Sequence, residues 1–343
     1  MGCTRELDFA MNTQSHFFTG LFRVLNEARL NYVVLHSWQT LPEKATSDVD
    51  MLISADEKKR LSKLLKKAEE MTGWRFVQKL WYDVPWCFYY VAVSPNGKAS
   101  VALDFVSDPK GTGEYRIKDS LILPHRVFSG YLYHLSPEAE LAYKLAKRRV
   151  KGVFREEDLA FVNEFYDKCD HVALAERLQE LIPERLVSEV LHLMAKNAVR
   201  AEYQQFMCRN TPAFVLFGRR WRIKFGVEWF VATIKRIFYR IKHPTGCILY
   251  LKDHSQVEIC AESAFESERS FPHFMFRRIE FQGSYGKLSW RKRIAVLSSA
   301  TLEVIANSKE DGFDLGSGFV PVSNGLGISA SVLDGMQRRL VWE

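Results

Sequence analysis

The sequence predicts an α+β fold, in which a mixed sheet with flanking helices is followed by a helical domain and a small α/β region. Short runs of β-formers separated by polar turns fill residues 32–106, helical spacing of apolar residues dominates 136–242, and a strand-like run returns at 247–251. A chain of 343 residues is too long for one small core. We therefore expect three segments, at 1–135, 136–243 and 244–343.

The first segment alternates between amphipathic helices and short strands. Helices are expected at 15–29 and 54–71, the second capped by Ser54 and ended by Gly73. Strands are expected at 32–38, 47–53, 74–80, 86–93 and 100–106, the last two joined by a turn at 95–97. Aromatic residues are dense in and between these strands: Trp81, Tyr82, Trp86, Phe88, Tyr89 and Tyr90. They could form a platform that stacks on a base or a sugar. Packing on a face of the sheet is favoured, because the alternation of side chains along a strand explains half of them.

The second segment opens with a strong helix signal. Ser136, Pro137 and Glu138 supply a cap, a first-turn proline and an acid, and the helix should run to Arg149. Further helices are expected at 156–167, 172–181 and 183–205.

Composition is that of a soluble globular protein, with 47% hydrophobic and 26% charged residues. No apolar run reaches the length needed to cross a bilayer, and the first residues carry no signal-peptide core, so a cytoplasmic location is expected. The six cysteines are scattered without ligand spacing, which argues against a zinc site or a disulfide framework.

Two acidic residues stand at the start of one strand-like run, and a third lies at the centre of another. In a strand, side chains at i and i+2 share a face, which places Asp48 and Asp50 together. Adjacent carboxylates repel, and one takes up a proton unless a cation lies between them. Asp104, alone in the apolar run 100–106, would complete a set of three carboxylates able to hold two Mg²⁺ ions.

The paired acids are also compatible with two simpler or different roles. Asp48 and Asp50 could form a solvated acidic entry to the strand, although the third acid and the spacing would then be coincidence. The Asp-x-Asp of metal-dependent glycosyltransferases normally follows a larger nucleotide-binding half, whereas only about fifty residues precede it here. A calcium loop is excluded because Leu52 occupies a position that needs an oxygen ligand.

The order of these motifs resembles the nucleotidyltransferase superfamily that includes polymerase beta. In that order, a strand is followed by a small residue and a gap of about ten residues. A run of acid-apolar-acid-apolar residues comes next, and a later strand carries one acid between apolar residues. Residues 32–50 look especially similar to bacterial nucleotidyltransferase-like proteins of surface-polysaccharide gene clusters. The resemblance covers about the first third of the chain well and the following helices weakly. It implies a nucleoside triphosphate substrate, with Asp48 and Asp50 binding both metals and Asp104 holding the catalytic metal and helping to deprotonate the nucleophile.

The resemblance also indicates substrate-binding residues. The family usually has Gly followed by Gly or Ser where this chain has His36 and Ser37, and the glycine lets the backbone approach the phosphates closely. Ser37 would contact phosphate, His36 could donate a hydrogen bond there, and Ser47 lies beside the acids. A lysine on the first helix of the helical domain often reaches the triphosphate, which indicates Lys144, or alternatively Lys147; a solvated basic face is the competing interpretation.

Basic residues concentrate in one segment. Residues 196–242 contain eleven Lys or Arg and two Glu. If residues 227–242 form a helix, its apolar side chains make one stripe: Phe230, Ile234, Ile237, Phe238 and Ile241. A connecting helix packed on its neighbours is favoured; weak contact with an anionic membrane surface and binding of nucleic acid are the alternatives. Aromatic alternation of the kind that stacks on single strands is missing there, so no sequence-specific nucleic-acid binding is expected.

The third segment resembles a degenerate kinase-like remnant. A helix-breaking segment at 243–246 leads into the strand-like run 247–251, as in some polysaccharide-cluster relatives, where a phosphate-binding loop follows. Here the residues after that run, Lys252 to Gln256, contain no glycine and no Gly-Lys-Ser that could bind phosphates.

The sequence therefore predicts a Mg²⁺-dependent nucleotidyltransferase-like protein that transfers a nucleotidyl or related phosphoryl-linked group to a small-molecule or saccharide acceptor. The alternative is a catalytically inactive protein of the same fold that serves as a binding module or scaffold, because His36 replaces the glycine.

Overall fold

A computed structural model of the chain describes residues 13–83, 85–96, 99–111, 115, 117–212, 226–242, 250–251 and 280–281. The basic run 219–224, the bare loop 252–256 and most of the third segment lie outside the described residues.

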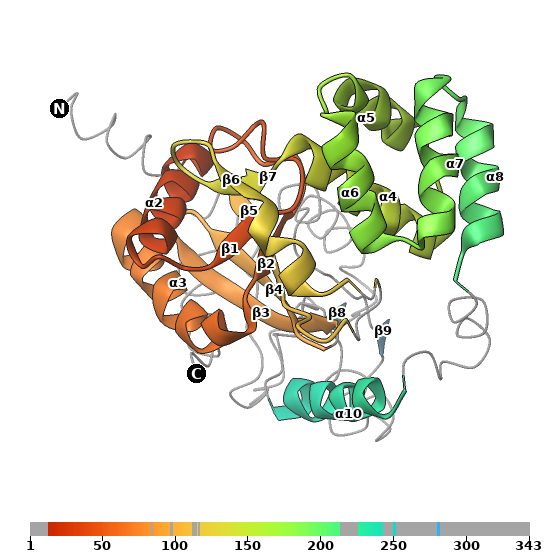
Figure 1. The fold of residues 1–343 in the computed structure, drawn as a ribbon. Coiled ribbons are helices and arrows are strands. Elements are labelled where there is room, and N and C mark those ends of the chain that lie inside the picture. Colours follow the sequence, from red (N-terminus) through yellow and green to blue (C-terminus); the bar gives the residue numbers. More distant parts are fainter. Residues whose placement is uncertain are drawn as a thin grey trace.

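A mixed sheet forms the centre of the described fold (Figure 1). It has seven strands in the order β3-β4-β5-β2-β1-β7-β6. Their bounds are β1 Tyr32–Val34, β2 Val49–Ile53, β3 Arg75–Asp83, β4 Cys87–Val93, β5 Ser100–Val106, β6 Arg126–Phe128 and β7 Tyr133–Leu135. Strands β2 and β5, and strands β1 and β7, pair in parallel, and the other neighbours pair antiparallel. The predicted mixed sheet with flanking helices is thus confirmed, while β6 and β7 were not predicted.

Helices α2 (Gln14–Glu27) and α3 (Lys58–Thr72) cover one face of the sheet (Figure 1). Their apolar residues pack with every second residue of the central strands, including Tyr32, Val34, Met51 and Ile53. Because side chains alternate along a strand, Val33, Leu35 and Leu52 face the other way. That second face packs against Ala139 and Tyr143 of α4 (Pro137–Lys151).

Four further helices pack on α4 in a hydrophobic cluster of their own. They are α5 Glu156–Tyr166, α6 His171–Leu181, α7 Glu184–Ala195 and α8 Arg200–Asn210. The single helix predicted over 183–205 is wrong, because the chain turns between α7 and α8 at Asn197, whose φ is 52°. Asparagine tolerates this left-handed conformation, which a continuous helix cannot contain.

Helix α10 (Gly226–Lys242) lies at the edge of the molecule, beside β3 and away from α4 to α8 (Figure 1). Of the third segment, the structure describes two short strands, β8 (Tyr250–Leu251) and β9 (Glu280–Phe281), which pair in parallel. Within the described ranges, no helix is long and apolar enough to cross a bilayer.

Candidate metal centre

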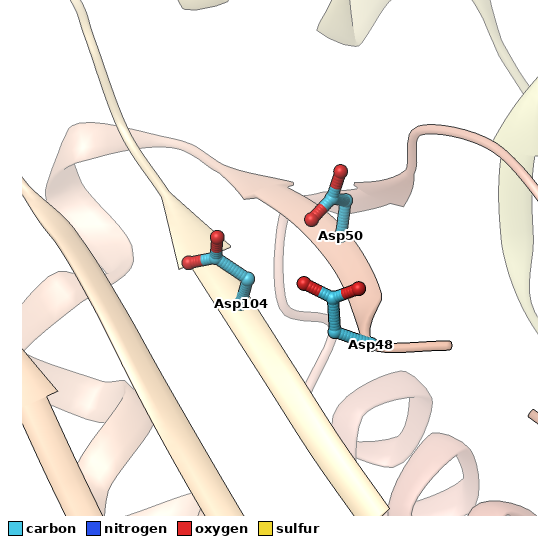
Figure 2. A group of neighbouring side chains, drawn as sticks. All are labelled: Asp48, Asp50 and Asp104. Atoms are coloured by element: carbon cyan, nitrogen blue, oxygen red, sulfur yellow. The ribbon is translucent and has the colours of Figure 1, made fainter. Parts of the chain in front are cut away.

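Three carboxylates converge where β2 and β5 run side by side (Figure 2). Asp50 stands directly opposite Asp104 in the parallel register, and Asp48 precedes Asp50 on the same face. One oxygen from each of Asp48, Asp50 and Asp104 can be chosen so that all three lie within 4.8 Å of one another. The structure therefore brings together the three acids that the sequence singled out.

Packing explains why these side chains share one face. Val49, Met51 and Ile53 are buried in the cluster beneath α2 and α3. A period of two then turns Asp50 toward α4, beside buried Leu52. A slip of one residue would place the carboxylates beneath α2 and α3 and turn Val49, Met51 and Ile53 toward the site, so the hydrophobic pattern of β2 fixes the position of the acids.

Asp50 is held by two basic side chains. His36 Nε2 lies 2.7 Å and Lys147 Nζ 3.4 Å from the same oxygen, Oδ2 of Asp50. The loop that follows β1 and carries His36 is fixed to β2, because the backbone N–H of Leu35 donates to the carbonyl of Asp50 at 2.9 Å. Burial alone would raise the pKa of Asp50, but the hydrogen bond to His36 and the charge of Lys147 outweigh it and hold that pKa well below its usual range.

Asp104 has the opposite electrostatic balance. Burial, and then the negative charge of Asp50, raise the pKa of Asp104 to about 7. Its Oδ1 accepts a hydrogen bond from the Cys87 thiol at 2.9 Å. Burial, reinforced by the charge of Asp104, raises the pKa of Cys87 well above its usual value, which keeps this thiol protonated. The pair of acids thus favours one ionised and one partly protonated carboxyl.

The donor set fits a hard divalent cation. All three groups offer carboxylate oxygens, the ligands that Mg²⁺ and Mn²⁺ prefer. Lys147 contributes one ammonium beside three carboxyl groups, and the charge of Asp50 adds to burial in raising the pKa of Asp104. The bond from Lys147 to Asp50 also means that a cation must share that carboxylate or displace the lysine.

A cavity of about 140 Å³ opens beside the carboxylates. That is near the volume of an engineered cavity that takes up one benzene ring. Asp50, Asp104 and Lys147 stand on its wall. The rest is mostly apolar or aromatic, with Leu35, Leu52, Tyr82, Asp83, Pro85, Trp86, Cys87, Val106, Asp108, Tyr115, Ile117, Ile122 and Tyr143.

The predicted substrate-binding residues separate into two groups. His36 contacts Asp50, and Ser37, whose Oγ lies 3.3 Å from His36 Nδ1, is exposed with a φ of 58°. Ser47 is exposed, and its hydroxyl donates to the carbonyl of Asp48 at 3.2 Å. Lys144 turns away from the carboxylates, with its Nζ 3.7 Å from Asp158 Oδ1 and 3.9 Å from the ring centre of Phe161. Its alternative, Lys147, is the lysine of α4 that reaches the acids.

Most of the crowded aromatic residues pack within the fold. Phe88, Tyr89 and Tyr90 are buried in β4, and Trp81 stacks on Phe88 with a centroid distance of 5.5 Å. Trp86 and Tyr82 border the cavity instead. Sheet packing therefore accounts for most of the group, and two of its members stand where a ligand ring could contact them.

Sequence reasoning missed Cys87 and Tyr143. The spacing of the cysteines does not single out Cys87, yet the hairpin places Tyr89 opposite Asp104 and Cys87 opposite Val106, so the thiol reaches the acid diagonally. Counting back from the turn at 95–97 could have revealed this neighbour. Tyr143 lies one helical turn before Lys147, which the helix period could have indicated.

Comparison with known proteins adds no assignment: no protein-family model and no curated protein matches this chain.

Proposed function

We propose that this protein is a metal-dependent nucleotidyltransferase that moves a nucleotidyl, or a related phosphoryl-linked, group from a nucleoside triphosphate to a hydroxyl or phosphate of a small-molecule or saccharide acceptor. The observation that carries the proposal is the convergence of Asp48, Asp50 and Asp104 across two parallel strands. The motif order of residues 32–50 supports the same proposal by resemblance.

Each residue has a distinct task in this proposal. Asp48, Asp50 and Asp104 would hold two Mg²⁺ ions, which supply charge neutralisation on the phosphates and a lowered pKa of the attacking hydroxyl. Asp104 would hold the catalytic ion and help to accept the proton of the acceptor hydroxyl. Ser37, exposed beside His36, would bind phosphate, and the cavity next to Asp104 would receive a ring of the substrate.

One observation favours the alternative function, a binding module or scaffold without turnover. His36 and Lys147 both contact Oδ2 of Asp50, so the cluster is partly neutralised by its own chain. A cation must compete with these contacts, whereas a glycine at position 36 would leave the carboxylate more open. Metal-dependent binding of a nucleotide distinguishes the two functions.

The first prediction is that calorimetry with ATP, CTP, GTP and UTP detects binding of at least one nucleotide in the presence of Mg²⁺ and none when the metal is chelated. Asp48→Asn removes one negative charge from the cluster while keeping its size, so it should weaken this binding by about tenfold or more. Glu157→Asn, on the exposed surface of α5, is the matched control and should bind as the wild type does.

Two outcomes would contradict the enzyme proposal. Failure to bind any of the nucleotides with Mg²⁺ present would leave the scaffold function. Binding that is equally strong in Asp48→Asn would show that a nucleotide binds elsewhere, without help from the carboxylates.

A further inference from the structure

Helix α10 presents an apolar face to solvent. The exposed fractions are 60% for Phe230, 37% for Ile234, 46% for Ile237 and 66% for Phe238, and Val231 beside them is 43% exposed. Positions i, i+4, i+7 and i+8 form a single stripe on an α-helix. A packed connecting helix would bury this stripe, whereas the described part of the chain leaves it uncovered.

The opposite side of α10 attaches the helix to the sheet. Arg236 Nη1 donates to the carbonyl of Tyr82 at 2.8 Å and lies 3.5 Å from Asp83 Oδ1. The ring of Tyr239 meets Trp81 and Phe88 edge-on, at centroid distances of 5.7 and 5.5 Å. At about 100° per residue, these two positions lie roughly opposite the stripe. The helix is therefore fixed with its apolar face directed outward.

The charge of α10 indicates what would cover that face. The helix contains Lys235, Arg236, Arg240 and Lys242 but a single acid, Glu228. Lys235 is exposed next to the stripe. A second copy of the helix would bring like charges together, whereas anionic lipid headgroups would meet Lys235 while the stripe enters the acyl boundary and Arg236 stays bonded to the sheet. Seventeen residues with four cations suit a helix that lies in the interface rather than one that spans it.

We propose that α10 docks the protein on an anionic membrane surface, with Phe230, Ile234 and Phe238 inserted at the headgroup level and Lys235 contacting lipid phosphates. The helix is bonded to Tyr82 and Asp83, which also line the cavity beside the carboxylates. Docking would therefore hold that cavity close to the membrane surface. This inference does not depend on the proposed chemistry, since it rests on α10 and its contacts alone.

Vesicle co-sedimentation of the full chain tests the proposal. The wild type should pellet with vesicles of phosphatidylglycerol and phosphatidylcholine, and high salt or pure phosphatidylcholine should release it. Phe238→Asp removes apolar area and adds a charge of the same sign as the lipid, so it should weaken partitioning by about tenfold or more. Lys235→Gln should weaken it by about fivefold and reduce its salt dependence.

Val172→Asp is the matched control, because Val172 on α6 is even more exposed, at 71%, and lies outside the stripe. It should pellet like the wild type. Circular dichroism checks that each variant is folded, and analytical ultracentrifugation without vesicles measures self-association.

Three results would overturn the proposal. The first is no pelleting of the wild type with anionic vesicles. The second is equal pelleting of Phe238→Asp and the wild type. The third is a wild-type protein that forms a dimer and does not pellet with vesicles, while Phe238→Asp is a monomer. That result would assign the stripe to contact between copies of the chain.

Discussion

Ser37 has an unusual backbone for a residue with a side chain. Its φ of 58° lies in the left-handed region, which costs an L-residue about 1 kcal/mol or more and which glycine adopts freely. The residue sits between His36, bound to Asp50, and Trp38, whose indole N–H donates to Glu140 Oε2 at 3.1 Å. Both neighbours are anchored, so the strain is held in place. Strained residues of this kind concentrate at functional sites.

We predict that Ser37→Gly and Ser37→Ala separate stability from binding. Ser37→Gly should raise the free energy of unfolding by about 1 kcal/mol because the strain is relieved, whereas Ser37→Ala keeps the strain and should change it little. Both variants lose the hydroxyl, so both should weaken Mg²⁺-dependent nucleotide binding by about tenfold. Urea denaturation and calorimetry measure the two effects. Equal stability of the two variants would show that position 37 carries no strain.

At the residue scale, the sequence could predict the acids but not their partners. The i, i+2 spacing puts Asp48 and Asp50 on one face of a strand, and the isolation of Asp104 singles it out, but their convergence depends on the pairing of β2 with β5. The lysine that reaches Asp50 depends on how α4 is rotated against the sheet. A rotation of about 60° would exchange Lys144 for Lys147, and periodicity alone does not fix it to that accuracy.

At the element scale, a buried carboxyl joins the loop after β1 to α4. Glu140 lies in the first turns of α4, is 1% exposed and accepts the indole N–H of Trp38. The ring of Trp38 also stacks on His134 with a centroid distance of 3.6 Å. Burial raises the pKa of Glu140 to about 7 despite the hydrogen bond from Trp38. The contact between loop and helix therefore includes an acid that is neutral in mildly acidic solution.

We predict that Glu140 makes the protein less stable as the pH rises. The pKa of Glu140 is about 7 in the folded state, against an ordinary value of 4.5, so the folded state binds more protons between these two pH values. Stability should fall across that window and level off above it, by an amount on the order of 3 kcal/mol.

Glu140→Gln stays neutral and keeps an oxygen that can accept from Trp38. It should match the wild type near pH 4.5 and exceed its unfolding free energy above pH 7. Glu157→Gln, exposed on α5, serves as the control and should follow the wild type at every pH. Urea denaturation across this range measures the difference. A constant offset between Glu140→Gln and the wild type would mean that Glu140 does not titrate in this window.

Helices and strands could be predicted where the hydrophobic pattern extends over many residues. Helices α2, α3 and α4 and strands β3, β4 and β5 lie within a few residues of the expected ranges, because periodicity and caps mark them. Strands β6 and β7 have three residues each and form only because they pair with each other and β7 with β1. The break between α7 and α8 depends on one left-handed asparagine, which a helical pattern conceals.

At the scale of the whole molecule, α4 belongs to two packing units. Ala139 and Tyr143 pack on the sheet, whereas Leu141 and Leu145 lie in the cluster of α4 to α8. Burial lowers the pKa of Lys147, but the interactions with Tyr143 and Asp50 outweigh burial and raise that pKa to about 12. The ion pair between Lys147 and Asp50 therefore links the helical cluster to the sheet at the carboxylates.

We predict that Lys147→Gln makes the stability of the protein depend more strongly on Mg²⁺. Without metal, the loss of a largely buried cation leaves the carboxylates repelling one another, which should cost about 3 kcal/mol. A metal ion can replace the ammonium, so a Mg²⁺ concentration one hundred times the dissociation constant of Lys147→Gln should restore about 2.7 kcal/mol to it, and the same concentration should stabilise the wild type less because its lysine competes for Asp50. Lys67→Gln breaks the half-exposed pair with Glu27 and should cost less than about 1 kcal/mol, with the Mg²⁺ response of the wild type. Urea denaturation with Mg²⁺ and with chelator measures all three proteins. If Mg²⁺ stabilised Lys147→Gln no more than Lys67→Gln, the ammonium and the metal would not share the Asp50 carboxylate, and the proposed position of the metal would be wrong.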